Sequence, residues 1–232
     1  MTVFFRHSTI DKNTSHKPVM AKSLPLRRDG FYRLGGKMVF DWLLVLAALP
    51  VVVPLVGILA LLLVLGGSVP FYRQRRVGRN GKVFQMLKLR TMVPNAEQVL
   101  QDYLAKNPEA RREWDRDQKL RDDPRVTRLG YFLRKASIDE LPQLWNVLRG
   151  EMSLIGPRPM MVEQQALYPN PGAAYYRLRP GITGLWQVSD RNESSFAERA
   201  DFDGRYYNDL SLQADLSIFM RTIGVVIRAT GY

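Results

Sequence analysis

The sequence has no cysteine and only two histidines, His7 and His16, among its 232 residues. The absence of cysteine excludes disulfide bonds, thiolate metal ligands and a cysteine nucleophile. Both histidines lie in a polar N-terminal stretch, which argues against a histidine-based triad, a zinc site of the usual kind or a histidine general base. Any chemistry must therefore use carboxylates, arginine, lysine and hydroxyl groups.

Acidic residues are scarce in the first part of the chain. Residues 1–92 contain 15 lysines and arginines but only 3 acidic residues, whereas residues 93–232 contain 19 of each sign. A nucleic-acid-binding protein is expected to carry a basic face on its folded domain, and here the second part is neutral. Basic residues beside an apolar segment instead favour the anionic cytoplasmic leaflet of a membrane, where each contributes about 1 kcal/mol. The sequence thus predicts membrane binding and no nucleic-acid partner.

Residues 42–65 form an apolar run of 24 residues without a charged or polar side chain. A helix needs about 20 apolar residues to span a bilayer, so the run is long enough. Both flanks are basic, however, and no orientation of a single span leaves the positive charge on one side. Pro50 and Pro54 should break or sharply bend the helix near its middle. We therefore predict a re-entrant helix that enters and leaves on the cytoplasmic face; a spanning helix with a tolerated kink is the alternative.

The pattern divides the chain into three regions. These are a polar basic tail at residues 1–30, a membrane-inserted segment at 31–68 and one cytoplasmic domain at 69–232. The fold class expected for the whole is mixed α/β and dominated by helices, with few short strands and with amphipathic helices at the membrane interface.

Hydrophobic periodicity and turn residues predict the elements of the cytoplasmic domain. Short strands are expected at Val69–Tyr72 and Lys82–Leu89, with a turn at Arg79–Gly81 between them. Helices are expected over 95–120 with an interruption at Asn107–Pro108, over Arg125–Lys135, over Leu141–Arg149, and along the apolar face Leu212, Leu216, Phe219, Met220, Ile223 and Ile227.

The run Ser137–Pro142 is the most informative stretch for chemistry. Glycine-rich phosphate loops of the P-loop and Rossmann types are missing, so neither ATPase nor dinucleotide chemistry is supported. Ser137 and Glu140 have the S-x-x-E spacing of a helix capping box. Asp139 and Glu140 would then lie at a helix N-terminus, where the helix dipole keeps carboxylates ionised. Two such carboxylates could also serve as a nucleophile and a magnesium ligand, although spacing alone favours capping.

Three segments place basic residues next to proline, glycine or a strand end: Lys88–Thr91, Gly156–Pro159 and Arg179–Gly184. The planar fork of arginine suits phosphate oxygens, and rigid neighbours hold it at low entropic cost. In a neutral domain tethered to a membrane, these segments indicate an anionic, phosphate-bearing substrate. The candidate contacts are Lys88, Arg90, Arg158 and Arg179.

Four ordered motifs resemble those of a known family: Lys88–Met92, Ser137–Asn146, Arg149–Pro159 and Arg179–Val188. The sequence is similar to the bacterial sugar transferases, the monotopic phosphoglycosyl transferases, from about Phe40 to its C-terminus. Within this family it most resembles the ExoY-type undecaprenyl-phosphate galactose phosphotransferases. The family's membrane segment is a re-entrant helix, and its usual Ser-Pro pair is replaced here by Val53 and Pro54.

The resemblance implies roles for individual residues. Asp139 would be the nucleophile, and Glu140 would bind Mg²⁺ as the cofactor. Active-site or substrate-phosphate roles would fall to Lys88, Arg134, Arg158 and Asp203.

The resemblance also implies a reaction. A sugar 1-phosphate, here galactose 1-phosphate, would pass from a UDP-sugar to undecaprenyl phosphate with release of UMP, through a covalent phosphosugar on Asp139. This step would prime exopolysaccharide synthesis at the cytoplasmic face of the bacterial inner membrane. The same reaction with UDP-glucose is one alternative, because sequence does not reveal the contacts that select the sugar. A membrane-anchored scaffold without activity is the other, and the sequence leaves open whether a homodimer forms.

Overall fold

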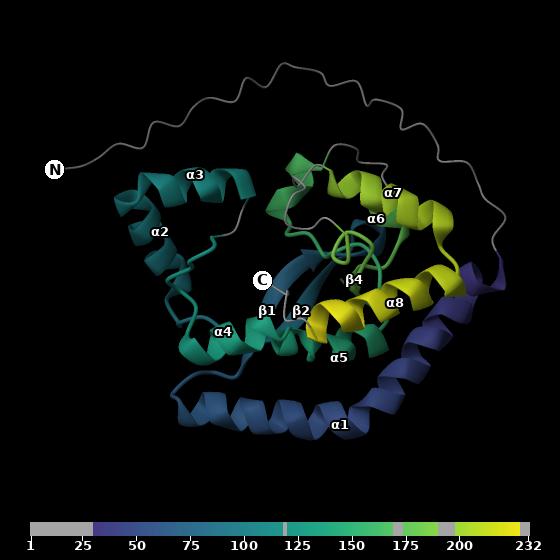
Figure 1. The fold of residues 1–232 in the computed structure, drawn as a ribbon, viewed down its shortest axis with the longest axis horizontal. Coiled ribbons are helices and arrows are strands. Elements are labelled where there is room, and N and C mark those ends of the chain that lie inside the picture. Colours follow the sequence, from purple (N-terminus) through teal and green to yellow (C-terminus); the bar gives the residue numbers. More distant parts are fainter. Residues whose placement is uncertain (1–29, 118–119, 169–173, 190–197, 228–232) are drawn as a thin grey trace, which may run out of the picture.

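The structure is a computed structural model that describes residues 30–117, 120–168, 174–189 and 198–227. Helices dominate these residues, and the strands form one antiparallel hairpin and one short parallel pair (Figure 1). The predicted mixed α/β, helix-dominated class is therefore confirmed. The predicted tail lies outside the described residues, apart from Gly30.

Helix α1 (Lys37–Leu65) follows a π-helical turn at Tyr32–Gly36. Together they form a 34-residue helix that is long and apolar enough to cross a membrane, with a mean hydropathy of 2.9 in its most apolar window. Only 6% of that window is buried, unlike the core helix of a soluble protein. Pro50 and Pro54 both lie inside the helix, and Figure 1 shows α1 bending between two arms. The chain thus bends at the proline segment, as predicted, without leaving the helical conformation.

Both arms of α1 pack against the rest of the protein. Val45, in the first arm, is buried in a cluster with Phe84 and Val147. Leu59 and Leu63, in the second arm, are buried in another cluster with residues of β2 and α4. The opposite surface of both arms exposes large apolar side chains: Leu43, Leu46, Val51, Val53, Ile58, Leu61, Leu62 and Leu65. One side of α1 therefore belongs to the protein core, and the other is apolar and uncovered.

The hairpin consists of β1 (Phe71–Val77) and β2 (Val83–Leu89), with Phe71 opposite Leu89 and Val77 opposite Val83. The predicted turn is confirmed, and Asn80 and Gly81 supply its positive φ angles of 58° and 75°. The predicted first strand at Val69–Tyr72 was wrong in its limits. The polar and charged residues at 73–76 do not show the apolar pattern of a strand. They belong to one nevertheless, because β1 is held by backbone pairing with β2 and one of its sides is exposed.

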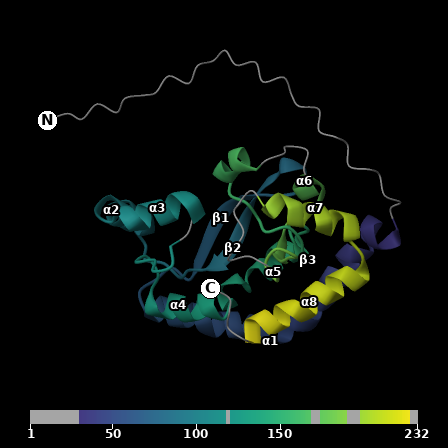
Figure 2. The same cartoon turned by 45° about the horizontal axis from the view of Figure 1, so that its top comes forward.

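Helices α2 (Ala96–Lys106) and α3 (Pro108–Asp117) meet at Asn107, so the predicted interruption is confirmed. They enclose a small cluster of their own around Leu100, Leu104 and Leu120. Figures 1 and 2 show this helical pair set apart from the remaining elements. Helix α4 (Arg128–Lys135) follows, and the Thr127 hydroxyl caps it by accepting from the Gly130 N–H.

The remaining elements build the rest of the domain: α5 (Gln143–Leu148), β3 (Ser153–Ile155), α6 (Ala174–Arg177), β4 (Gly181–Thr183), α7 (Arg199–Asp209) and α8 (Leu212–Ile227). Strands β3 and β4 pair in parallel, with Ser153 opposite Gly181 and Ile155 opposite Thr183. On α8, Ile218 is buried, whereas Leu212, Leu216, Met220 and Ile223 are exposed. The side chain of Ile227 lies outside the described residues.

Candidate active site

Asp139 and Glu140 occupy a single 3₁₀ turn, Ile138–Glu140, between α4 and α5. Ser137 adopts the left-handed conformation with φ 55° and makes no side-chain capping bond. The capping-box interpretation is therefore wrong: Ser137 lets the chain reverse direction between two elements, and the helix itself begins only at Gln143. The carboxylates of Asp139 and Glu140 therefore do not belong to a helix cap, and Asp139 is only 6% exposed.

Lys88 approaches this turn from the end of β2. Its Nζ lies 2.7 Å from Glu140 Oε1 and 3.6 Å from Asp139 Oδ2. The Lys88 ammonium group therefore forms an ion pair with both carboxylates, although Lys88 is about fifty residues away in the sequence. The structure brings these three predicted site residues together.

Asn146, on α5, holds β2 beside this site. Its side-chain amide accepts from the Leu87 N–H at 3.0 Å and donates to the Gln85 carbonyl at 2.8 Å. Asn146 is 2% exposed, so these bonds satisfy a buried amide. They close the edge of β2 not paired with β1, one residue before Lys88. Asn146 is thus a positioning residue for Lys88.

The environment of Asp139 sets its protonation. Burial raises the pKa of the Asp139 carboxyl above its ordinary value, the Lys88 charge lowers it, and the Glu140 charge raises it. Sequence reasoning expected a helix N-terminus to keep Asp139 ionised. In the structure α5 starts four residues later, and the cations Lys88, Arg134 and Arg158 oppose the effect of burial instead.

Arg134 and Arg158 flank the carboxylates. Arg134 Nε donates to Thr91 Oγ1 at 2.9 Å. Arg158 Nη1 lies 3.9 Å from Glu140 Oε1, and its side chain is 40% exposed. The charge of each lowers the pKa of Asp139. Arg134 is therefore held in place by the chain, whereas Arg158 has room to move toward a ligand.

A small cavity opens beside Glu140, with a volume of about 20 Å³. Its walls come from β1, β2, β4, the segment 140–143 and the loop after β3, and consist of Arg76, Met86, Lys88, Glu140, Gln143, Arg158, Pro159, Gly181 and Ile182. This volume holds about one water molecule. A substrate must therefore displace side chains to enter, and the half-exposed Arg158 is the one with most room to do so.

The loop after β3 and strand β4 are joined through glycines. The Gly156 N–H donates to the Thr183 carbonyl at 2.9 Å, and the Gly181 N–H donates to the Pro157 carbonyl at 2.8 Å. A Cβ atom on Gly184 would lie 2.0 Å from the Gly156 carbonyl oxygen, and one on Gly181 would lie 2.1 Å from the Gly156 nitrogen. Only glycine allows the backbones to come this close, which explains why two predicted basic motifs meet.

Besides Arg134, three predicted contacts lie away from the cavity wall. Arg90 donates to the Val69 carbonyl at 3.0 Å and stacks over Tyr72. Burial lowers the pKa of the Arg179 guanidinium, and the charge of Asp41 on α1 raises it. Asp203, on α7, is 4% exposed and accepts from Tyr168 Oη at 2.5 Å.

Asp203 belongs to a buried network behind the cavity. Burial raises the pKa of Asp203 to about 6, against the hydrogen bond from Tyr168 and the charge of Arg199, which lower it. Arg199 donates to the Arg158 carbonyl at 2.6 Å and lies over the Trp186 ring. This network supports the backbone that carries Arg158.

Sequence reasoning missed two residues of the cavity wall, Arg76 and Gln143. Gln143 lies inside the Ser137–Asn146 motif and could have been found there. Arg76 lies in the basic stretch that follows the apolar run, which the sequence analysis interpreted as a membrane flank. Its position on a strand, facing inward, was the missing signal, because strand β1 was not predicted over residue 76.

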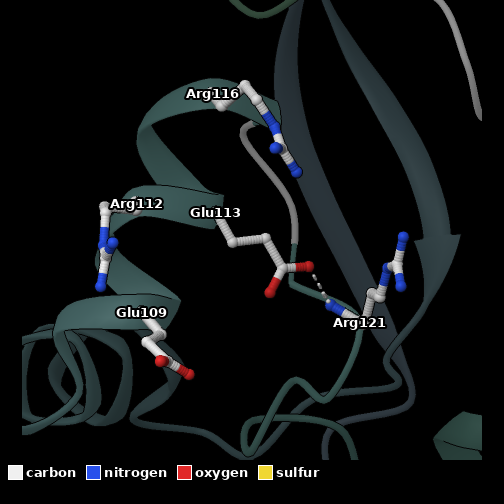
Figure 3. Close-up of a pocket in the computed structure, with 5 residues that line it drawn as sticks. All are labelled: Glu109, Arg112, Glu113, Arg116 and Arg121. Carbon is white, nitrogen blue, oxygen red and sulfur yellow. Dashed lines mark hydrogen bonds between the residues drawn. The ribbon is translucent and has the colours of Figure 1, made fainter.

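A wider hollow, of about 470 Å³, lies between α3 and the segment that carries Arg121 (Figure 3). Its walls are Glu109, Arg112, Glu113, Arg116 and Arg121. Glu113 accepts from the Arg121 backbone N–H at 2.8 Å and so fixes the chain after α3. The hollow is open and of mixed charge, and its walls include no residue of the carboxylate turn or of the predicted basic segments, so the smaller cavity, lined by Lys88, Glu140 and Arg158, is the candidate site.

The Asp139 and Glu140 carboxylates are candidate ligands for a metal ion whose remaining ligands are water and substrate phosphates. In the part of the chain that the structure describes, no group of three or more His, Asp or Glu side chains is arranged to hold a metal ion. Mg²⁺ usually takes one or two carboxylates and completes its shell with water and substrate phosphates. The adjacent carboxylates of Asp139 and Glu140 fit that mode of binding.

A family model described as bacterial sugar transferase matches residues 32–229. The chain belongs to this family. The match covers helix α1, the carboxylate turn and the residues that line the cavity, and it identifies the protein as a transferase enzyme.

Individual sugar transferases from several bacteria are similar to the chain. The exopolysaccharide production protein ExoY of Sinorhizobium fredii is 44% identical over 95% of this chain and 99% of its own length. A UDP-galactose-lipid carrier transferase of Erwinia amylovora is 47% identical over 84% of this chain, which spans only 41% of that protein. A UDP-glucose:undecaprenyl-phosphate glucose-1-phosphate transferase of Caulobacter vibrioides is 41% identical over 73% of this chain and 61% of its own length.

Proposed function

We propose that the protein transfers a sugar 1-phosphate from a UDP-sugar to undecaprenyl phosphate, releases UMP, and so primes exopolysaccharide synthesis. The observation that carries the proposal is the buried Asp139 carboxylate, which lies 3.6 Å from Lys88 and directly precedes Glu140; Lys88 and Glu140 both line the cavity. A carboxylate in such surroundings can act as a covalent nucleophile without any histidine or cysteine. The names of the relatives, which specify lipid carriers and undecaprenyl phosphate, agree with this reaction.

In the first step an Asp139 carboxylate oxygen attacks the β-phosphorus of the UDP-sugar. A new P–O bond forms to Asp139 as the bond from that phosphorus to the bridging oxygen breaks. The electron pair of the broken bond leaves with UMP, and the sugar phosphate stays on Asp139 as an acyl phosphate. The raised pKa of Asp139 makes its carboxylate a stronger nucleophile than an ordinary aspartate once it is ionised.

In the second step a phosphate oxygen of undecaprenyl phosphate attacks the same phosphorus. The P–O bond to Asp139 breaks, and the carboxylate is restored as the lipid diphosphate sugar leaves. Lys88 and Arg158 lie where negative charge develops in both steps, because both face the Glu140 side of the cavity. Such preorganised cations stabilise a phosphoryl-transfer transition state more than the ground state.

Mg²⁺ is the cofactor we propose for this site. Glu140 would hold it, with substrate phosphates completing the coordination. When bound, the ion supplies positive charge that neutralises the diphosphate. Lys88 already performs part of this task at Glu140.

The membrane segment is proposed to be re-entrant and to lie in the cytoplasmic leaflet of the inner membrane. Near its first end, Lys37 Nζ donates to Asp215 Oδ2 at 2.6 Å, and the Ser153 hydroxyl donates to Asp41. Near its other end, Leu63 packs in a cluster with Leu133. Contacts with one domain at both ends favour a helix that leaves the bilayer on the side where it entered. The reaction site is then close to the lipid phosphate.

Galactose is the sugar that we propose, with glucose as the alternative. The Erwinia relative is named for UDP-galactose and is 47% identical, whereas the Caulobacter relative is named for UDP-glucose and is 41% identical. These two sugars differ only at one hydroxyl group, which a hydrogen-bonding site can distinguish strongly.

UMP release by the purified protein tests the proposal. The protein is incubated with Mg²⁺ and UDP-galactose or UDP-glucose, with and without undecaprenyl phosphate. We expect continuous UMP release with acceptor and a burst of one UMP per enzyme without it. Asp139→Asn should reduce the rate by several orders of magnitude, whereas Asp102→Asn, an exposed site on α2, should not change it.

Each other outcome has a distinct meaning. UMP release that survives Asp139→Asn would place the nucleophile elsewhere. Turnover without a burst would indicate direct transfer between substrates and remove the covalent intermediate. No UMP from either sugar nucleotide would contradict the proposed reaction and favour the scaffold.

A further inference from the structure

Arg76, which none of the functional roles above includes, enters the cavity from β1. Its Nη1 donates to the Pro159 carbonyl at 2.9 Å, and its Nη2 donates to Gln74 Oε1 at 2.6 Å. Its Nε is buried and has no hydrogen-bond partner among the described residues. A guanidinium has five N–H donors, and these two hydrogen bonds use two of them, so three have no partner among the described residues in a side chain that lines the cavity.

The charge of Arg76 is not neutralised by a carboxylate. Within the described residues, Lys88 pairs with Glu140 and Arg125 pairs with Asp123, whereas no ion pair includes Arg76. Both of its bonding partners are neutral amide oxygens. A desolvated cation without a counter-charge costs free energy, so a fold retains one where an anion completes the site.

Other arginines add to the positive potential at this wall. Burial, together with the charges of Arg158 and Arg199, lowers the pKa of Arg76 to about 10, although the charge of Glu140 acts in the opposite direction. Arg199 is balanced by Asp203, whose charge raises the Arg199 pKa, and Arg158 lies 3.9 Å from Glu140. Among the described cations of the cavity wall, Arg76 is therefore the one that forms no ion pair with a carboxylate.

We infer that Arg76 binds the phosphate that leaves as UMP, as a substrate-binding residue of the proposed reaction. The reacting β-phosphorus must lie at Asp139, whose carboxylate is 3.6 Å from Lys88 Nζ and is not part of the cavity wall. Arg76 lies in that wall, together with Glu140 and Arg158. It is thus placed for the neighbouring phosphate of the same diphosphate. The inference rests on the proposed function, since UMP is the leaving group only in that reaction.

Binding of uridine, UMP and UDP measures this contact without turnover. Their dissociation constants are determined by calorimetry on the full-length protein in detergent, for the wild type and for Arg76→Gln. A charge-assisted contact to phosphate is worth about tenfold or more in affinity. Arg76→Gln should therefore reduce the preference for UMP over uridine by about this factor, while the preference for UDP over UMP stays unchanged.

Arg75→Gln is the matched control, because Arg75 is the preceding residue of β1 and is exposed. Its binding constants should equal those of the wild type. A purely structural role of Arg76, through its bond to Pro159, would weaken all three ligands alike and leave both preferences intact. If Arg76→Gln does not fold, Arg76→Lys is measured in its place; its single ammonium should lower the preference for UMP over uridine severalfold.

Three results with Arg76→Gln would overturn the inference. The first is an unchanged preference for UMP over uridine, and the second is a reduced preference for UDP over UMP with no other change. The third comes from the UMP-release assay and is a change only in the KM for undecaprenyl phosphate. The second would assign Arg76 to the β-phosphate and the third to the acceptor. Wild-type protein that releases no UMP from either UDP-sugar would instead refute the proposed function, so the two failures are distinguishable.

Discussion

Lys88 Nζ lies 2.7 Å from Glu140 Oε1, and the same ammonium group lies 3.6 Å from Asp139 Oδ2. One cation thus stands between two adjacent carboxylates that would otherwise repel each other in a buried turn. It lowers the pKa of Asp139 against the effects of burial and of Glu140. The availability of the nucleophile therefore depends on a residue of a different element.

Replacing Lys88 by methionine should move the acid limb of the pH profile to higher pH. Lys88 favours the ionised form of Asp139, so its removal raises the pKa of the nucleophile, and the ionised fraction at a given acidic pH falls. Glu140→Gln should move the limb the other way, because it removes a neighbouring negative charge. The measurement is kcat/KM for UMP release against pH, with the exposed Lys82→Met as control. Shifts of both variants in one direction would contradict this account.

Gly184→Ala should destabilise the protein and reduce its activity. The new Cβ would lie 2.0 Å from the Gly156 carbonyl oxygen, so the segment after β4 and the segment after β3 must move apart. Backbone atoms cannot move aside as the end of a flexible side chain can. We therefore expect the free energy of unfolding to fall by about 3 kcal/mol, the upper end of the usual range for single substitutions. Thermal unfolding in detergent measures the change.

Gly204→Ala provides the control for that substitution. Gly204 lies inside α7, and a Cβ there would meet nothing within 4 Å. Alanine is favoured over glycine in a helix by about 1 kcal/mol, so this variant should keep or raise the unfolding temperature. Equal losses in both variants would show that close loop packing is not the cause.

Asp203 should make stability fall as pH rises from about 4 to about 6. Its pKa is near 3.8 in the unfolded chain and about 6 in the folded one, so the folded state holds the extra proton in this window. Between pH 4 and pH 6 the free energy of unfolding of the wild type should therefore fall by about 3 kcal/mol relative to that of Asp203→Asn. Above about pH 7 the difference should be constant. The measurement is the unfolding temperature of both proteins against pH; a parallel dependence would refute the shift.

Replacing Pro50 and Pro54 by alanine should convert the bent helix into a span. Two prolines interrupt the hydrogen bonds of α1, and a straight helix of this length can cross the bilayer. Because the chain has no cysteine, a single Ser8→Cys can be labelled selectively in whole cells. The tail should become accessible from outside only in the double variant. A tail that stays cytoplasmic there would show that the prolines do not decide the topology.

Sequence reasoning was most successful where a local pattern decides the structure. The apolar run with its prolines, the turn at Asn80 and Gly81 and the helix break at Asn107 all depend on residues close in the chain. The Asp139–Glu140 pair was also recognised from its motif. The capping role for Ser137 was wrong because S-x-x-E spacing does not distinguish a cap from a left-handed turn.

Tertiary structure decided which charged side chains share a site. Strand pairing turns Arg76 into the cavity, although its surroundings in sequence resemble a membrane flank, whereas Arg90 and Arg179 face other partners. The sequence by itself determined the apolar helix, the basic flanks and the presence of a carboxylate pair, because these follow from composition and short-range order. The convergence of Lys88 with that pair, and the burial that raises the Asp139 pKa, required contacts between segments far apart in the chain. No local pattern encodes such contacts, since they arise only when the backbone of β2 is held against the turn.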